Sequence, residues 1–303
     1  MRPPLEIGSC SVPVTRSGFL RTMSVVSAPS APPVAYLGPE GSFSHLVARQ
    51  RYQDRELVPF KTIPEVFDFL NETQESVGVV PIENSSGGTI MPTVDGLIEN
   101  ACRLYVEEEL SLDVKLALLG RRGAEINTVY SHFAPLQHCG KWLKKHYPRA
   151  REVATPSTSG AVQLAAGEAD SAAIGRIENA EMYGLEVLSY PIADEIPNVT
   201  QFFVIGHHKA TSGECRKTSL VVALRDEAGS LCSFLTPFRE AAVSLKRIQS
   251  RPIVGHPNTY MFFIEVDGCE ADQNVQQALT SAAGVASSIE SLGSYPVKPR
   301  YTS

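Results

Sequence analysis

The sequence predicts an α/β protein in which a larger α/β domain precedes a ferredoxin-like domain. Between residues 34 and 206, short apolar segments typical of buried strands alternate with segments whose apolar residues have helical spacing. This alternation is typical of a sheet with helices on both faces. Beyond residue 216 the expected order is strand, helix, strand, strand, helix, strand, which is the ferredoxin-like order. The 303 residues suffice for two domains.

Composition suggests the domain boundaries. Residues 1–33 contain three arginines and one acid and end in a run of proline, alanine and serine. They lack the amphipathic helix of a transit peptide and the long apolar centre of a secretory signal, so we expect a disordered tail. The larger domain is expected at 34–206, a polar linker at 207–216 and the ferredoxin-like domain at 217–297.

In the first part of the larger domain, strands are expected at 33–38, 57–60 and 78–83, with two more within 104–119. Ser42 or Ser44 is expected to cap the first helix. Thr62, followed by Pro64 and Glu65, is a typical start for the second. A third helix is expected to end at about Asn100.

A second lobe of this domain is expected from about Gly120. Strands are predicted at 127–131 and 172–174, and a strand at 202–206 is expected to close the domain. One helix is expected to carry Cys139, Trp142 and Leu143, another to follow the turn at 154–160, and a third to end at Tyr183.

In the C-terminal domain the predicted strands are 218–224, 245–248 and 260–266. Helices are expected at 229–239 and 272–279, and residues 285–292 are also predicted to be helical.

Overall composition excludes several classes of function. The net charge of −6 argues against a nucleic-acid partner, and no apolar run reaches the length of a membrane span. The six cysteines are scattered without a CxxC pair, so we expect no metal site and no redox motif. Scattered thiols are typical of a reducing cytoplasm, which is the expected location.

The stretch from Gly78 to Thr89 joins an apolar strand to a polar loop. Glu83, Asn84, Ser85 and Ser86 follow the strand, and a Gly-Gly pair then allows unusual backbone conformations. Polar side chains and free amides at a strand-to-helix junction suit carboxylate binding. An ordinary surface turn uses the same residue types, so composition alone leaves both interpretations open.

Four motifs in order resemble the prephenate dehydratase family. They are Tyr36-Leu37-Gly38-Pro39-Glu40-Gly41-Ser42-Phe43-Ser44, Pro81-Ile82-Glu83-Asn84-Ser85, Asn198-Val199-Thr200-Gln201-Phe202 and Gln249-Ser250-Arg251-Pro252. The resemblance covers about residues 34–297. It implies a two-lobed catalytic domain of the periplasmic-binding-protein type, with substrate between the lobes, and a C-terminal ACT domain.

The implied substrate is prephenate, a diacid that loses carbon dioxide without a cofactor. In the dehydratases the ring hydroxyl departs in the same reaction and the ring becomes aromatic. Hydroxide is a poor leaving group, so an acid or strong hydrogen-bond donor must meet it. The resemblance assigns this role to Thr200.

The resemblance, together with the polar loops it marks, places further residues in the substrate pocket. They are Glu83, Asn84, Ser85, Ser131, Ser157, Thr158 and Gln201. Purely structural interpretations stand beside these roles: Thr200 as a strand residue, Ser131 as a strand-end cap and Asn84 as a turn former.

Three departures from the family pattern affect the expected chemistry. Gln201 replaces an arginine, His138 replaces a glutamine, and Arg176 stands in a rewritten Ser-Glu-x-Ala segment. Glutamine has neither the charge nor the planar fork of arginine, whereas imidazole exchanges protons near neutral pH. Arg176 either restores the charge missing at Gln201 or lies in solvent.

These departures favour a prephenate decarboxylase, which expels carbon dioxide, keeps the hydroxyl and serves secondary metabolism. His138 or Glu83 would then govern protonation of a ring carbon. The alternative is a prephenate dehydratase, or its arogenate-using variant, that forms the aromatic keto acid. A binding or sensor protein without chemistry is a third class. No cofactor and no metal are expected.

The C-terminal motif also departs from the ACT pattern. Its candidate regulatory residues are Ser244, Gln249, Ser250, Arg251 and Pro252. Ser244 replaces an asparagine and Gln249 a glutamate. These departures argue against phenylalanine feedback and favour a domain that serves mainly to form a homodimer or homotetramer; an amino-acid effector at this domain is the alternative.

Overall fold

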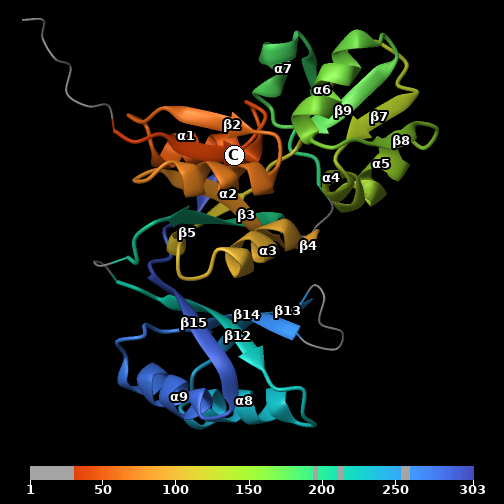
Figure 1. The fold of residues 1–303 in the computed structure, drawn as a ribbon. Coiled ribbons are helices and arrows are strands. Elements are labelled where there is room, and N and C mark those ends of the chain that lie inside the picture. The colour runs from red at the N-terminus through yellow and green to blue at the C-terminus, as the bar shows by residue number, and fades with distance from the viewer. Residues whose placement is uncertain (1–30, 194–196, 211–213, 254–259) are drawn as a thin grey trace, which may run out of the picture. The chain divides into compact units, whose positions relative to one another are not determined.

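Three sheets run through the residues that the computed structural model describes, which are 31–193, 197–210, 214–253 and 260–303 (Figure 1). The predicted tail at 1–33 lies outside these residues except for its last three positions, and part of the predicted linker at 207–216 lies outside them too. From Ala31 onward the chain forms one compact unit.

The first sheet has the strand order β16-β5-β11-β3-β1-β2, with the short β4 paired to β3. Strands β1, β2 and β3 are parallel, while β11 is antiparallel to both of its neighbours, β3 and β5. The first lobe consists of this sheet and helices α1, α2 and α3. Its elements are β1 (Val34–Leu37), α1 (Phe43–Arg51), β2 (Leu57–Phe60), α2 (Ile63–Glu72), β3 (Val77–Asn84), β4 (Gly88–Thr89), α3 (Met91–Glu99), β5 (Tyr105–Asp113), β11 (Val199–Gly206) and β16 (Tyr301–Thr302).

Two helix starts in this lobe are the ones that the sequence predicts. The Ser42 side chain accepts a hydrogen bond from the backbone N–H of His45 at the start of α1. Thr62 and Glu65 form a capping box at the start of α2, each side chain bonding the other's backbone N–H.

The second sheet has the order β10-β6-β9-β7-β8 and, with helices α4 to α7, forms the second lobe. Its elements are β6 (Ala117–Gly120), β7 (Thr128–Ser131), α4 (Phe133–His138), α5 (Gly140–His146), β8 (Arg151–Ala154), α6 (Thr158–Gly167), β9 (Ser171–Gly175), α7 (Asn179–Tyr183) and β10 (Glu186–Ser189). The sequence does not reveal β8 and β10, because both are short, partly exposed edge strands. The single helix expected around Cys139 is two helices.

The third sheet confirms the predicted strand-helix-strand-strand-helix-strand order. Its elements are β12 (Lys217–Leu224), α8 (Ser230–Glu240), β13 (Leu245–Pro252), β14 (Tyr260–Asp267), α9 (Gln273–Ala283) and β15 (Ala286–Tyr295). The strand order is β13-β14-β12-β15, and α8 and α9 lie together on one face (Figure 1).

The prediction of a helix at 285–292 is wrong, because these residues form most of β15. Val285, Ile289 and Leu292 have helical spacing, which explains the error. Antiparallel pairing with β12 along nearly its whole length determines the strand instead.

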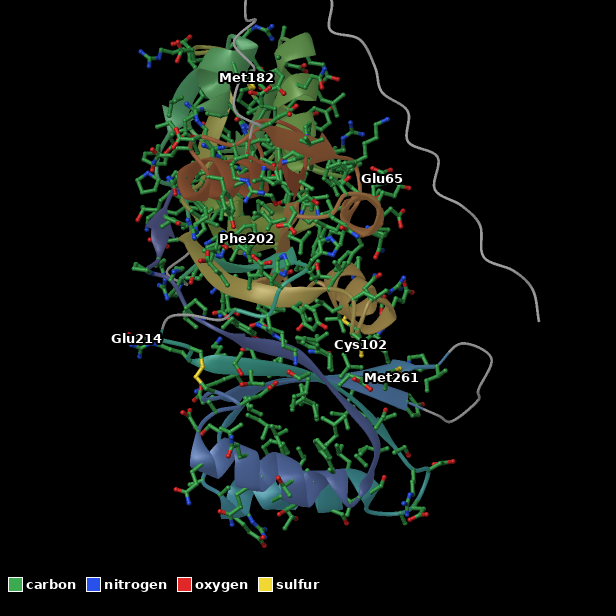
Figure 2. The ribbon with its side chains drawn as sticks, turned by 60° about the vertical axis from the view of Figure 1, so that its left-hand side comes forward. Glu65, Cys102, Met182, Phe202, Glu214 and Met261 are labelled. Carbon is green, nitrogen blue, oxygen red and sulfur yellow. A yellow bond between two sulfur atoms is a disulfide. The ribbon has the colours of Figure 1, made fainter. Side chains whose placement is uncertain are left out.

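The first and third sheets share a hydrophobic core. Phe203 and Ile205 of β11 belong to the same buried cluster as Val221, Phe263 and Leu292 of the third sheet. Phe202, the neighbour of Phe203, points into the first-lobe interior and is 1% exposed (Figure 2). The strand that carries Thr200 is therefore packed on both faces. Among the described residues, no helix is long and apolar enough to cross a membrane.

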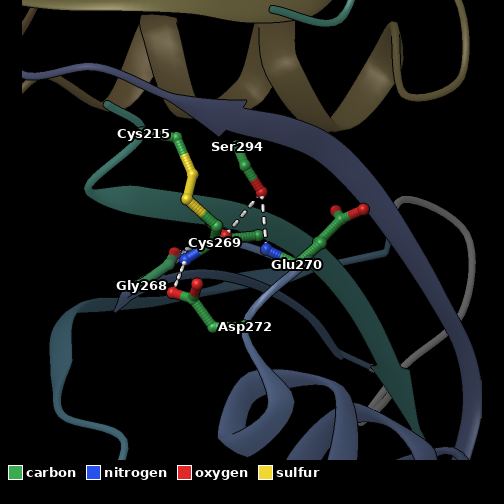
Figure 3. The surroundings of a disulfide bond; sticks show 7 residues. Cys215, Gly268, Cys269, Glu270, Asp272 and Ser294 are labelled. Carbon is green, nitrogen blue, oxygen red and sulfur yellow. Dashed lines mark hydrogen bonds between the residues drawn. A yellow bond between two sulfur atoms is a disulfide. The ribbon is translucent and has the colours of Figure 1, made fainter. Parts of the chain in front are cut away.

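A disulfide joins Cys215 to Cys269, with the two Cα atoms 5.7 Å apart (Figures 2 and 3). The sequence predicts unpaired thiols, and the separation of 54 residues explains why no motif revealed this pair. Cys269 lies in a turn held by Asp272, whose carboxylate accepts the Cys269 N–H at 2.7 Å. The bond ties the start of β12 to the end of β14.

We expect removal of this disulfide to lower the free energy of unfolding by about 2–4 kcal/mol, because the bond restricts the unfolded chain. Urea unfolding of a Cys215→Ser/Cys269→Ser variant, compared with the parent protein with and without reductant, measures the effect. The variant should not respond to reductant. An oxidised parent that is no more stable than its reduced form contradicts the expectation.

Candidate active site

The adjoining ends of β3 and β11 bring Asn84 and Thr200 together. The two residues face each other in the antiparallel register, and the Asn84 amide Nδ2 donates to Thr200 Oγ1 at 2.8 Å. The same amide group donates to Asn198 Oδ1, also at 2.8 Å. Because Thr200 Oγ1 accepts from Asn84, its hydroxyl proton points away from that amide.

The loop after β3 completes this group of side chains, which we call the Asn84 cluster: Asn84, Ser85, Ser86, His138, Asn198 and Thr200. Asn84 Oδ1 accepts the backbone N–H groups of Ser86 and Gly87, each at 2.9 Å. Ser85 Oγ donates to the Pro197 carbonyl and accepts the Val199 N–H. These bonds fix the loop to the start of β11.

His138, the last residue of α4, contributes to the Asn84 cluster from the second lobe. It is 5% exposed, and its Nδ1 lies 2.9 Å from Ser86 Oγ. An ionisable ring thus lies one hydrogen bond from the loop that carries Asn84.

A cavity of about 250 Å³ opens beside the cluster. Its lining comes from the segment that crosses between the lobes, from α4 and from the approach to β11: Asp113, Val114, Lys115, Leu116, His138, Pro191, Ile192, Ala193, Pro197 and Asn198. Small-molecule sites usually have volumes of about 300–1,000 Å³, so this cavity is slightly smaller than a typical one. Lys115 brings a cation to it, paired with Asp113 at 2.9 Å.

Glu83 and Gln201 lie on the opposite face of these strands from Asn84 and Thr200. The two face each other one register step away, and successive side chains of a strand point to opposite faces. Glu83 bonds Arg247 of β13 at 2.9 Å. Gln201 Oε1 accepts from Arg247, and its Nε2 donates to Glu109. The structure therefore places Gln201 beside Arg247 rather than in the Asn84 cluster.

Three predicted pocket residues lie in the second lobe and make local bonds. Ser131 is fully buried, and its hydroxyl donates to the Ile174 carbonyl at 2.8 Å. Ser157 caps α6 by accepting the Gly160 N–H, and the buried Thr158 begins that helix. The structure does not join these three to the Asn84 cluster through hydrogen bonds.

The chain matches the prephenate dehydratase family model over residues 34–210, more than half of its length. It is also 36% identical over 266 residues to the bifunctional chorismate mutase/prephenate dehydratase of Stutzerimonas stutzeri, covering 87% of this chain and 73% of that protein. The chain belongs to the prephenate dehydratase family.

Solved structures of family members have the same fold. The prephenate dehydratase of Arthrobacter aurescens, crystallised with L-Phe, is 28% identical with a TM-score of 0.78, covering 87% of this chain and 89% of that one. The Staphylococcus aureus prephenate dehydratase is 27% identical with a TM-score of 0.74, covering 87% and 99%.

Arg176, a departure from the prephenate dehydratase pattern, is 6% exposed. Its Nη1 donates to the carbonyls of Gly41 and Ser42 in the β1–α1 loop, each at 3.2 Å, and its Nη2 lies 3.2 Å from Glu178. Burial lowers its pKa, partly offset by Glu178. Its charge therefore serves a contact between loops of the two lobes, and it does not lie in solvent.

The candidate regulatory residues separate along β13. Gln249 donates to Thr89 of β4 at 2.9 Å, and Arg251 forms two bonds to Asp95 of α3. Ser244, Ser250 and Pro252 are exposed. Two of these side chains thus bind the first lobe of the prephenate dehydratase domain.

Sequence reasoning missed Asn198, Ser86 and Lys115. Asn198 belongs to one of the prephenate dehydratase motifs, so its spacing of two residues from Thr200 was the available signal. Ser86 belongs to the polar loop after Ile82 that composition singles out, although no role was assigned to it, and nothing in the sequence marks Lys115. Among the described residues, no group of three or more His, Cys, Asp or Glu side chains is arranged to hold a metal ion.

Proposed function

We propose that this protein is a prephenate dehydratase, converting prephenate to phenylpyruvate, carbon dioxide and water. The observation that carries the proposal is the 2.8 Å bond from Asn84 Nδ2 to Thr200 Oγ1. A donor on the oxygen of a hydroxyl strengthens that hydroxyl as a donor in turn. Asn84 thus prepares Thr200 to act on the departing ring hydroxyl.

In this reaction the bond from the ring to its carboxylate breaks, and its electron pair enters the ring. The carbon–oxygen bond at the opposite ring carbon breaks with its electron pair going to oxygen, and the hydroxide leaves as water with the Thr200 hydroxyl proton, which a solvent proton replaces. The Thr200 hydroxyl donates to the leaving oxygen, where negative charge develops. Lys115, in the adjacent cavity, supplies positive charge for a diacid substrate.

The position of Gln201 supports the dehydratase over the decarboxylase that the sequence favours. Glutamine at position 201 favours a decarboxylase only where it weakens the positive field beside the Thr200 hydroxyl. Gln201 lies on the other face of β11, where Arg247 already supplies a guanidinium at 2.7 Å. The exchange therefore leaves the surroundings of the Thr200 hydroxyl unchanged.

A prephenate decarboxylase remains the second candidate, and the position of His138 favours it. This ionisable ring is buried, bonds Ser86 and lines the cavity beside Asn198. A ring that exchanges protons near neutral pH can deliver one to a ring carbon of the substrate. In that case the hydroxyl stays and a non-aromatic keto acid forms.

Product analysis decides between the two. We expect purified protein and prephenate to yield phenylpyruvate, seen as aromatic proton signals in the NMR spectrum. Gln201→Arg should leave the product unchanged, because position 201 faces away from the cluster. His138→Gln is the matched test of the second candidate. A non-aromatic keto acid from the parent protein that becomes aromatic in His138→Gln would establish the decarboxylase, and unreacted prephenate would indicate a binding protein.

We also propose that the third sheet and its helices form an ACT domain that joins two copies of the chain. The predicted strand order supports this, as does the family resemblance of residues 249–252. The Arthrobacter aurescens protein was crystallised with L-Phe, so phenylalanine is the effector to test. Calorimetric titration with phenylalanine tests the effector, and light scattering tests the dimer.

A further inference from the structure

The third sheet reaches the first lobe through alternate side chains of β13. Arg247, Gln249 and Arg251 all point to the first lobe and bond Glu83, Thr89 and Asp95 respectively. Arg247 is the most buried of the three, with a side chain that is 5% exposed. It lies over the ring of Phe203 on β11, 5.9 Å from the centroid.

The Arg247 guanidinium bonds three side chains on three strands. Its Nε donates to Glu83 Oε2 of β3 at 2.9 Å, and its Nη2 to Gln201 Oε1 of β11 at 2.7 Å. Its Nη1 donates to Glu265 Oε2 of β14, also at 2.9 Å. A planar guanidinium holds its acceptors in one plane with fixed separations, which an ammonium does not do.

Two of these acceptors form a cross-strand pair next to the Asn84 cluster. Gln201 faces Glu83 in the register, and the next pair is Thr200 and Asn84. Arg247 therefore bridges β3 and β11 from behind, one residue from the bond between Asn84 and Thr200.

The backbone ladder is irregular at this point. The register between β3 and β11 shifts between Gln201 and Phe202. A bulge locally disrupts the ladder and increases the twist. The side-chain bridge through Arg247 thus links β3 and β11 at the point where their backbone hydrogen bonding is interrupted.

We propose that Arg247 is a positioning residue for the reaction, holding β3 and β11 at the separation that keeps Asn84 Nδ2 on Thr200 Oγ1. The part of this proposal that concerns turnover rests on the proposed dehydratase function. Arg247 touches no reacting atom, because it lies on the far face of both strands. It makes the third sheet part of the framework of the active site.

Arg247→Met removes the bridge and should lower kcat by about 10²-fold with KM changed less than threefold, since small misplacements of reacting groups carry penalties of that size. Arg247→Lys, which keeps the charge but not the fork, should recover part of kcat. Arg51→Met is the matched control. Arg51 also makes a two-bonded pair with a glutamate, Glu108 of β5, and its loss should leave kcat within twofold.

Hydrogen exchange of the free protein gives a readout that needs no turnover. The backbone N–H of Ser85 bonds the Val199 carbonyl across the two strands, so the amides at 83–85 and 199–201 should exchange faster in Arg247→Met than in Arg51→Met. If Arg247→Met does not fold, Arg247→Lys and Arg247→Met/Glu265→Gln take its place; the second removes a buried carboxylate that has lost one of its two cationic partners, Lys217 being the other. Unchanged kcat and exchange in Arg247→Met, or equal losses in Arg51→Met, overturn the proposal. If the parent protein does not turn over prephenate, the proposed function fails and the exchange result still decides the role of Arg247.

Discussion

Thr200→Val is expected to lower kcat by about 10²–10⁴-fold, the usual contribution of a positioned proton donor. Valine keeps the shape of threonine and removes the hydroxyl that we propose donates to the leaving group. Asn84 keeps its bond to Asn198, so the loop after β3 should stay in place and KM should change little. Steady-state kinetics with prephenate, following phenylpyruvate formation, measures both constants.

Thr200→Ser, which retains a hydroxyl, should recover most of the lost kcat. Thr93→Val is the matched control, because Thr93 is also a buried threonine near β3, with its hydroxyl donated to the Pro81 carbonyl at 2.6 Å. It should cost stability without changing kcat. A Thr200→Val protein that retains more than a third of the parent kcat would show that the hydroxyl does not assist the leaving group.

Lys217→Met is expected to lower the free energy of unfolding by about 3–5 kcal/mol, the usual cost of removing one partner from a buried ion pair. Lys217 Nζ lies 2.7 Å from Glu109 and 2.8 Å from Glu265, and both carboxylates are almost fully buried. Burial opposes the charge of Lys217, but the two carboxylates raise its pKa overall. Its removal leaves Arg247 to balance Glu83, Glu109 and Glu265.

The loss of stability in Lys217→Met should depend on pH. Burial, and then the charge of Glu265, raise the pKa of Glu109 above its ordinary value of 4.5, while Lys217 opposes the rise. A carboxyl with a raised folded-state pKa favours folding when protonated, and that contribution is lost as the pH rises through the folded-state pKa. Without Lys217 the pKa of Glu109 rises further. The variant's loss in free energy of unfolding relative to the parent should therefore be largest at neutral pH and shrink toward pH 4.5.

Urea unfolding at several pH values measures the deficit. Lys217→Met/Glu109→Gln should recover part of the stability at neutral pH, since it removes one uncompensated charge. Lys246→Met is the control, because its pair with Asp267 is about half exposed and such pairs contribute about 0–1 kcal/mol. Equal losses in Lys217→Met and Lys246→Met would show that the buried cluster does not stabilise the fold.

Local signals predicted most of the elements. Thr62, Pro64 and Glu65 start α2 as expected, because a helix cap depends on four neighbouring residues. The strand Leu57–Phe60 also has the predicted bounds, because these too follow from neighbouring residues in the sequence. The helix prediction for residues 285–292 was wrong because their apolar spacing fits a helix. Only pairing with β12 makes them a strand.

The candidate site was predicted in part. Asn84, Ser85, His138 and Thr200 come together as the motifs suggest. Glu83 and Gln201 do not join them. These residues are adjacent in the chain to Asn84 and Thr200, and adjacent residues of a strand point to opposite faces.

The sequence by itself determined the family, most of the elements and the candidacy of Asn84 and Thr200 as pocket residues, since short motifs and local spacing carry that information. Only the tertiary structure decided which face of β3 and β11 each side chain takes, that Cys215 pairs with Cys269, and that Arg247 reaches both Glu83 and Gln201. These facts depend on contacts between residues 46 to 164 positions apart. Such contacts form only when strands distant in the chain pack together, so no local pattern records them.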